Sequence, residues 1–308
     1  MKIALVGIGK IAVDQHVPAI AGGTEWDLAA TVSRHGTVPG VEAFTELGEM
    51  LAARPDIRVV SLCLPPVPRF IYAMQALRAG RHVMLEKPPG ATLAECHALE
   101  AVAQGAGLTL YATWHSRQAA MVGAAKAWLA DTALERLTVT WKEDVRRWHP
   151  GQAWIWEPGG MGVFDPGINA LSIVTEILAD DIHVTSAELE VPSNCQTPIA
   201  ARIAFHHPEG AEVTALFDWR EDGDQTWEIE AETAAGTLLL SDGGATLTVD
   251  GRATGTPAPL AGEYPRLYAQ MAELVARGGR DMDLRPMTLV TDALALGRRI
   301  EAEPFLDG

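Results

Sequence analysis

The first third of the chain alternates short apolar runs with segments that carry helix signals. The apolar runs predict strands over residues 3–6, 28–32, 59–64, 82–85 and 108–113. Between them, we expect one helix from Pro68 to Gly80 and another after Thr92, which forms a capping box with Glu95. Strands that alternate with helices in this way predict a parallel, doubly wound α/β sheet.

After about Arg117 the hydrophobic pattern changes character. The elements expected there are, in order, a helix over 121–130, a long strand over 134–145, a helix over 165–178, short strands between 184 and 249, and a last helix over 287–301. Three Asp-Gly pairs in the strand-rich stretch are typical of hairpin turns, at 222–223, 242–243 and 250–251. This part of the chain therefore predicts an α+β domain with an open, mostly antiparallel sheet.

Length and composition are ordinary for a globular protein of two domains, with 308 residues, 48% hydrophobic and 21% charged. The net charge of −16 argues against a broad basic face for nucleic acid or an anionic membrane. Three cysteines without metal-like spacing suit a reducing compartment, and no stretch resembles a signal peptide or a membrane span. We therefore expect a cytoplasmic protein that binds no metal, nucleic acid or membrane.

A glycine motif follows the first expected strand, in the sequence from Gly7 to Ala12, GIGKIA. In such a motif Gly7 makes the tight turn, Gly9 lets the backbone approach a pyrophosphate, and Ala12 lets helix and strand pack closely. The alternative is a glycine turn in an α/β protein that binds no nucleotide. With the repeated strand–helix units, the motif predicts a Rossmann dinucleotide-binding domain over residues 1–117. The remainder, 118–286, is then a substrate-binding and oligomerisation domain, and the helix 287–301 is expected to pack back on the first domain.

The second expected strand ends in Ser33 and Arg34, without the acidic residue that commonly binds the ribose of NAD. Ser33 can hydrogen-bond, and Arg34 can pair with a 2′-phosphate. We therefore expect NADP or NAD as the cofactor, with NADP accepted and preferred. The alternative is that Arg34 is only a solvated loop charge. Further cofactor contacts are expected from Lys10, Ile11, Pro65, Glu86 and Lys87.

Two segments carry candidate catalytic residues. Lys87 follows the strand 82–85, and ligands of parallel sheets lie beyond the carboxyl ends of the strands. Asp165 and Asn169 are four residues apart, so on a helix they share one face. The alternatives are a lysine that extends into solvent and an aspartate that only caps its helix.

Together, the motifs GIGKIA, EKP at 86–88 and GGMGVFDPGIN at 159–169 resemble the glucose–fructose oxidoreductase and inositol dehydrogenase family. The resemblance implies a Rossmann domain, followed by a domain whose open sheet often forms the subunit interface. It matches Lys87 and Asp165 to the family's site. Many members have histidine at the position of Asn169, and this departure, with Ser33 and Arg34, resembles the group of L-arabinose and D-galactose 1-dehydrogenases.

The same resemblance implies sugar contacts from His115, Trp148 and Trp227. Pyranose rings present apolar C–H faces that pack on an indole, and the indole N–H can meet a hydroxyl. The alternatives are core tryptophans and an ordinary loop histidine.

The resulting hypothesis is NAD(P)-dependent oxidation of L-arabinose, D-galactose or D-fucose at C1 to the lactone. Lys87 contacts O1, either Lys87 or Asp165 accepts the proton, and Asn169 orients a hydroxyl. The alternatives are a polyol dehydrogenase, an aldose–aldose oxidoreductase or a noncatalytic NAD(P)-binding sensor. A homodimer or higher oligomer is expected through the open sheet, where apolar positions include Ile199, Ile203 and Phe205.

Overall fold

The computed structural model describes residues 1–255 and 262–306 and divides the chain into two compact units. The first unit comprises Met1–His115 and Ala261–Asp283, and the second comprises Ser116–Leu260 and Leu284–Gly308. The return of the segment after residue 260 to the first unit was not predicted. Within the described ranges, no helix is both long and apolar enough to cross a bilayer.

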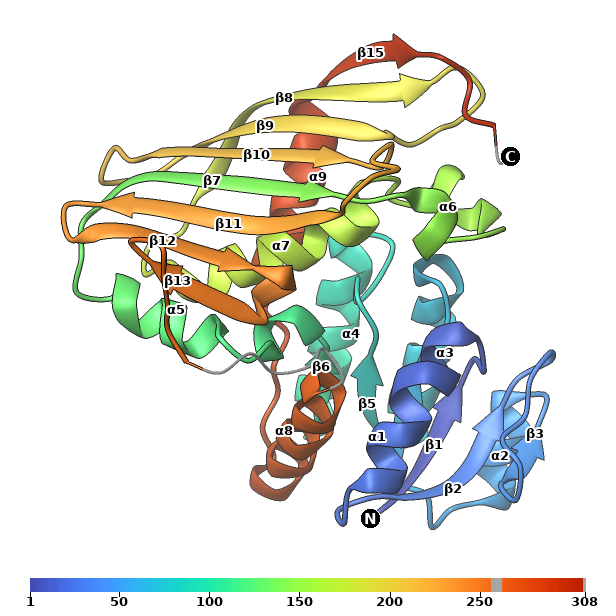
Figure 1. The fold of residues 1–308 in the computed structure, drawn as a ribbon. Coiled ribbons are helices and arrows are strands. Elements are labelled where there is room, and N and C mark those ends of the chain that lie inside the picture. Colours follow the sequence, from blue (N-terminus) through green and yellow to red (C-terminus); the bar gives the residue numbers. More distant parts are fainter. Residues whose placement is uncertain (256–261, 307–308) are drawn as a thin grey trace. The chain divides into compact units, whose positions relative to one another are not determined.

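A six-stranded parallel sheet forms the first unit, in the order β3-β2-β1-β4-β5-β6 (Figure 1). Its strands are β1 (Lys2–Val6), β2 (Asp27–Val32), β3 (Glu42–Phe44), β4 (Val59–Leu62), β5 (His82–Leu85) and β6 (Leu110–Ala112). The strand order reverses between β1 and β4, and ligands of such sheets bind beyond the carboxyl ends at this point. The predicted doubly wound parallel sheet is confirmed, although β3 was missed.

The helices of this unit are α1 (Val17–Gly22), α2 (Leu47–Ala53), α3 (Pro66–Arg78), α4 (Leu93–Gly105) and α8 (Glu263–Arg277). Because crossovers are right-handed, the change of winding direction at β1 and β4 puts α1 and α3 on opposite faces of the sheet. Apolar residues of α8 recur at helical spacing and are buried with α1 in one core, namely Tyr264, Leu267, Tyr268, Met271 and Leu274. This stripe explains why α8 belongs to the first unit.

The second unit is built on a nine-stranded sheet in the order β14-β13-β12-β11-β7-β10-β9-β8-β15. Its strands are β7 (Leu134–Lys142), β8 (His183–Pro192), β9 (Ala200–His206), β10 (Glu212–Asp218), β11 (Thr226–Thr233), β12 (Gly236–Ser241), β13 (Thr246–Val249), β14 (Arg252–Ala253) and β15 (Arg298–Ala302). Only the pairs β7/β10 and β8/β15 are parallel, so the predicted open, mostly antiparallel sheet is confirmed. The hairpin predicted at 222–223 is wrong, because β7 lies between β10 and β11.

One face of this sheet is covered by helices, as Figure 1 shows for α7 and α9. The helices of the unit are α5 (Val122–Leu129), α6 (Val145–Trp148), α7 (Phe164–Ile177) and α9 (Arg285–Leu296). Alternation along β7 follows from this packing: Leu137 and Val139 are buried, whereas Thr138 remains half-buried. The predicted strand 134–145 ends early because the Asp144 carboxylate accepts the Arg146 amide at 2.9 Å and caps α6.

The helix predicted over 287–301 is wrong in both its end and its packing. It ends at Leu296, and the chain continues as β15, which pairs in parallel with β8. A Cβ at Gly297 would lie 2.5 Å from the Ala293 carbonyl oxygen, so glycine permits the close turn between helix and strand. The helix contacts α7 and β8 and therefore belongs to the second unit, not to the Rossmann unit.

Candidate functional site

The glycine turn after β1 borders a cleft of about 330 Å³. Gly7 has a φ of +87°, and a Cβ there would lie 2.9 Å from the Leu64 side chain, so only glycine fits. A Cβ at Gly9 would meet nothing within 4 Å, which leaves its backbone facing open space. The other lining residues come from the ends of β1, β2, β3 and β4, from the loops that follow them and from α3. They are Val6, Ile8, Val32, Ser33, Arg34, His35, Thr45, Cys63, Leu64, Pro65 and Tyr72.

The residues after Gly9 lie beyond the cleft lining. Lys10 is exposed and pairs with Asp14, and Ile11 is also exposed. Ala12 is fully buried, which lets the following helix approach the sheet. The helix begins with a π-helical turn over Ala12–His16 before α1. The sequence motif predicted the glycine turn. It did not predict the π-helical turn, which is wider than an ordinary α-helical turn.

The loop after β2 forms the side of the cleft predicted to hold the ribose. The Ser33 hydroxyl oxygen accepts the amides of His35 and Gly36, each at 3.3 Å, which fixes the turn. The Arg34 guanidinium is 65% exposed and lies 3.3 Å from the Glu46 carboxylate. Among the described residues that line the cleft, none has a carboxylate side chain. The glycine turn and the absence of a carboxylate from this lining are compatible with a dinucleotide in the cleft, and Arg34 is the cationic side chain that lines it.

Lys87 is the second residue after β5 and is half-buried. Its loop is fixed on one side by Arg69 of α3, whose guanidinium donates to the carbonyl oxygens of Glu86, at 2.5 Å, and of Pro88. On the other side, the Glu86 carboxylate accepts the Lys87 amide at 2.9 Å. Both charged groups are buried, so the backbone on either side of Lys87 has little freedom.

The Glu86 carboxylate lies in the interior and not in the cleft, although a cofactor contact was predicted for this residue. His16 Nε2 lies 3.0 Å from one of its oxygens, and the Tyr264 hydroxyl donates to the same oxygen at 2.9 Å. Burial alone would raise the pKa of Glu86, but the hydrogen bond and charge of His16 lower it to about 2. Burial likewise lowers the pKa of His16, but Cys63, Tyr268 and Glu86 raise it well above its usual value.

His115, a predicted sugar contact, lies beside this network. Its Nδ1 is 2.6 Å from the Glu263 carboxylate, and its ring stacks on Tyr264 with centroids 5.6 Å apart. The side chain is only 18% exposed. The ion pair and the ring contact therefore restrict the orientation of the His115 side chain.

In the second unit, Asp165 is buried in the first turn of α7. The residue at the N-cap is Val163, and no side chain caps the helix there, so Asp165 is not the N-cap of α7. Glycine is required in the preceding loop, since a Cβ at Gly162, where φ is +54°, would lie 2.2 Å from the Pro198 carbonyl oxygen. Asn169, one turn later on the same face, is half-buried.

Asp165 is part of a buried polar cluster that the sequence analysis missed. His149 Nε2 lies 3.6 Å from the Asp165 carboxylate and 3.8 Å from that of Glu143. Glu143 in turn accepts the indole N–H groups of Trp219, at 3.2 Å, and Trp227, at 3.0 Å. A signal existed, because Glu143 and His149 lie within five residues of Trp148, which was a predicted sugar contact.

The two predicted sugar tryptophans lie next to one another. The rings of Trp148 and Trp227 have centroids 5.4 Å apart at an angle of 62°. Trp148 donates its indole N–H to Gln225 at 3.2 Å and is 38% exposed. A large exposed indole beside buried carboxylates is a surface suited to a ligand that has both apolar and hydroxyl groups.

Comparison with known proteins connects this geometry to a family. The sequence profile of the GFO/IDH/MocA family, described as an oxidoreductase family with an NAD-binding Rossmann fold, matches residues 1–113. A galactose 1-dehydrogenase from Pseudomonas fluorescens is 43% identical in an alignment of 320 positions, gaps included, that covers 100% of this chain and 99% of that protein. The chain belongs to the GFO/IDH/MocA oxidoreductase family. The predicted family resemblance is thus confirmed.

Solved structures of this oxidoreductase fold agree. A crystal structure of a D-galactose-1-dehydrogenase protein from Rhizobium etli is 53% identical, with a TM-score of 0.95 over 99% of this chain and 97% of that one. A 3-ketoreductase from Actinomadura kijaniata, in complex with TDP-benzene and NADP, has a TM-score of 0.86 over 98% of this chain and 99% of that one. At 19% identity, that second likeness shows the fold alone.

Proposed function

We propose that the chain is an NAD(P)-dependent aldose 1-dehydrogenase, which oxidises an aldopyranose at C1 to the aldonolactone. The observation that carries this proposal is the buried cluster of Glu143, His149 and Asp165, in a chain that matches a galactose 1-dehydrogenase along its whole length. Carboxylates accept hydrogen bonds from sugar hydroxyls, and the neighbouring indoles of Trp148 and Trp227 suit the C–H faces of a pyranose.

The glycine turn and the loop after β2 would hold the cofactor. Gly7 and Gly9 leave room for the pyrophosphate, and Ser33 and Arg34 would contact the ribose and its 2′-phosphate. Bound NAD(P) supplies the acceptor for the hydride that leaves C1. The proposal includes a cytoplasmic setting, in line with the sparse, odd number of cysteines.

The remaining roles belong to the chain's own side chains. Lys87 is assigned to the C1 oxygen, where its amino group can hydrogen-bond to the reacting hydroxyl. The proton of that hydroxyl passes either to Lys87 or to Asp165, which His149 holds in place. Asn169 orients the C1 or C2 hydroxyl, and His115 contributes a further sugar contact.

Comparing sugars tests the proposal. L-Arabinose, D-galactose and D-fucose share the same pyranose configuration at C2, C3 and C4, so all three are expected to be substrates. D-Glucose differs at C4 and would leave a buried partner without its hydroxyl, at a cost of about 1–3 kcal/mol. This implies a kcat/KM roughly tenfold to a hundredfold lower for D-glucose.

The measurement is kcat/KM for the four sugars and for myo-inositol with one cofactor, with the rate taken from the absorbance of the reduced cofactor. The product is then analysed separately. A free lactone with net cofactor reduction supports an aldose 1-dehydrogenase. Higher kcat/KM for D-glucose or myo-inositol than for L-arabinose and D-galactose would contradict it, and turnover of no aldose would favour a sensor.

Arg34→Ala is expected to weaken NADP binding much more than NAD binding. Arg34 is exposed, and its ion pair with Glu46 lies at the surface, where such pairs contribute little. The lost charge-assisted contact corresponds to about 1.5–3 kcal/mol, and so to a Kd for NADP roughly tenfold to a hundredfold higher. Glu46→Ala is the matched control, since it frees Arg34 and should not weaken NADP. Equal losses for both cofactors would remove Arg34 from this role.

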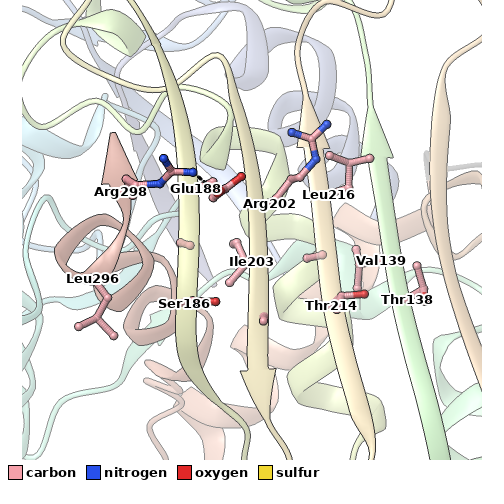
Figure 2. A pocket seen from close by; sticks show the side chains of 13 residues that line it. Thr138, Val139, Ser186, Glu188, Arg202, Ile203, Thr214, Leu216, Leu296 and Arg298 are labelled. Carbon is pink, nitrogen blue, oxygen red and sulfur yellow. Dashed lines mark hydrogen bonds and ion pairs between the residues drawn. The ribbon is translucent and has the colours of Figure 1, made fainter. Parts of the chain in front are cut away.

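A second copy of the chain is the expected partner of the open sheet face. Of the apolar residues first named for it, Ile199, Ile203 and Phe205 are all buried within this chain, and Ile203 borders a hollow of about 590 Å³ on that face. In this hollow Arg298 pairs with Glu188 and Leu216 lies half-buried (Figure 2). The hollow carries both acidic and basic side chains. In a two-fold dimer the same surface of each copy is in contact, so an acidic side chain of one copy can pair with a basic side chain of the other.

Sedimentation velocity at micromolar concentration tests the oligomer. The wild type is expected to sediment as a dimer or larger, and Leu216→Arg, which adds a like charge beside Arg202, should shift it toward monomer. A wild type that remains monomeric throughout would contradict this prediction.

A further inference from the structure

The loop that carries Lys87 depends on one buried carboxylate. One oxygen of Glu86 accepts the Lys87 amide at 2.9 Å, while the other lies 3.0 Å from His16 Nε2 and accepts the Tyr264 hydroxyl at 2.9 Å. His16 is fully buried and Glu86 is 4% exposed. With three donors on its two oxygens, the carboxylate has a single orientation that satisfies all of them.

Each partner comes from a different part of the first unit. His16 is the last residue of the π-helical turn that follows the glycine motif, and π-turns are frequent at functional sites. Tyr264 comes from α8, 178 residues from Glu86 in sequence, and Tyr268 on the same helix contacts His16 Nδ1 at 2.7 Å. Other ionisable groups around the pair are Cys63, Arg69, His115 and Glu263.

A buried ion pair is a costly way to stabilise a fold. Desolvation of two charges often cancels their attraction, and apolar side chains of similar volume commonly give equal or greater stability. The pair at His16 and Glu86 is therefore poorly explained by stability alone. The Glu86 carboxylate of this pair also accepts a hydrogen bond from the Lys87 amide, just after the strand that leads to the lysine.

We propose that His16, Glu86 and Tyr264 are positioning residues that fix the direction of the Lys87 side chain. Arg69 fixes the carbonyl groups on either side of Lys87, and the Glu86 carboxylate fixes its amide. Removing one donor to Glu86 lets the carboxylate rotate and releases the amide. The proposal rests on the proposed function for its effect on turnover, but the orientation of Lys87 is measurable without it.

A matched pair of tyrosine variants tests this. Tyr264→Phe and Tyr268→Phe each remove one buried hydroxyl from α8, but only Tyr264 contacts Glu86. We expect Tyr264→Phe to lower kcat about tenfold, because a misplaced catalytic group reduces turnover more than binding, while Tyr268→Phe stays within about threefold. The Kd for NADP should change less than about twofold in both variants. Equal losses of kcat, or losses that follow thermal stability alone, would overturn the proposal.

A spectroscopic measurement gives the same test without any substrate. The chain has five lysines, so reductive ¹³C-methylation labels few side chains, and the signal that is lost in Lys87→Arg is that of Lys87. We expect this signal to shift or broaden in Tyr264→Phe but not in Tyr268→Phe. A Lys87 signal that is unchanged in both variants would refute the proposal, even if no sugar proves to be a substrate, whereas an absence of sugar turnover alone would refute only the proposed function.

Two histidine variants provide an independent test if Tyr264→Phe does not fold, because they also compare a Glu86 that keeps its donor with one that loses it. His16→Gln can keep a donor toward Glu86, whereas His16→Asn keeps only the shorter contact toward Tyr268. The expected result is a perturbed Lys87 signal and lower kcat in His16→Asn, with partial rescue in His16→Gln. Identical behaviour of the two variants would count against positioning through Glu86.

Discussion

Lys87→Ala is expected to lower kcat by about a thousandfold or more, because the variant lacks the group at the C1 oxygen. Cofactor affinity should change little, since the glycine turn and the Ser33 loop are untouched. The measurement is steady-state turnover of D-galactose, with cofactor Kd from fluorescence titration. Lys126→Ala is the matched control, because Lys126 is an exposed lysine paired with Glu176. Near-wild-type turnover in Lys87→Ala would exclude Lys87 as a catalytic residue.

Lys87→Arg separates the two roles open to this lysine. An arginine keeps the positive charge but cannot act as a base in proteins. If Lys87 accepts the proton, Lys87→Arg should be as inactive as Lys87→Ala. If it only polarises the C1 oxygen and Asp165 accepts the proton, the arginine variant should retain measurable turnover.

Asp165→Asn is expected to lower kcat by about a hundredfold to ten-thousandfold, because an amide cannot accept the proton and no longer attracts His149. Stability should change less than activity, because asparagine has nearly the same volume as aspartate and can still accept hydrogen bonds in the buried cluster. Thermal unfolding and kcat measured on the same preparations check both statements, with the exposed Asp131→Asn as control. Full activity in Asp165→Asn would leave Glu143 or Lys87 as the proton acceptor.

Much of the fold was predictable because its signals are local. The turn at Gly7 needs a positive φ, and the Thr92 hydroxyl accepts the Glu95 amide at 3.2 Å, as the capping box predicted. Lys87 could be placed at a strand end because the apolar run of β5 stops just before it. Each of these features depends only on neighbours a few residues away.

The features that were missed depend on pairing between distant segments. The Glu86 network joins residues 16, 86 and 264, and no local pattern connects them. The insertion of β7 between β10 and β11 is likewise a matter of long-range register, so the Asp-Gly pair at 222–223 resembled a hairpin. Helix α9 was assigned to the wrong unit because its apolar stripe does not reveal which sheet it covers.

The most direct test of the central claim follows the hydrogen at C1. D-Galactose that carries deuterium at C1 is oxidised with NADP, and the reduced cofactor and the lactone are examined by mass spectrometry. Hydride transfer from C1 predicts a reduced cofactor one mass unit heavier and a lactone without the label. A reduced cofactor without deuterium, or a sugar product that retains it at C1, would contradict the account.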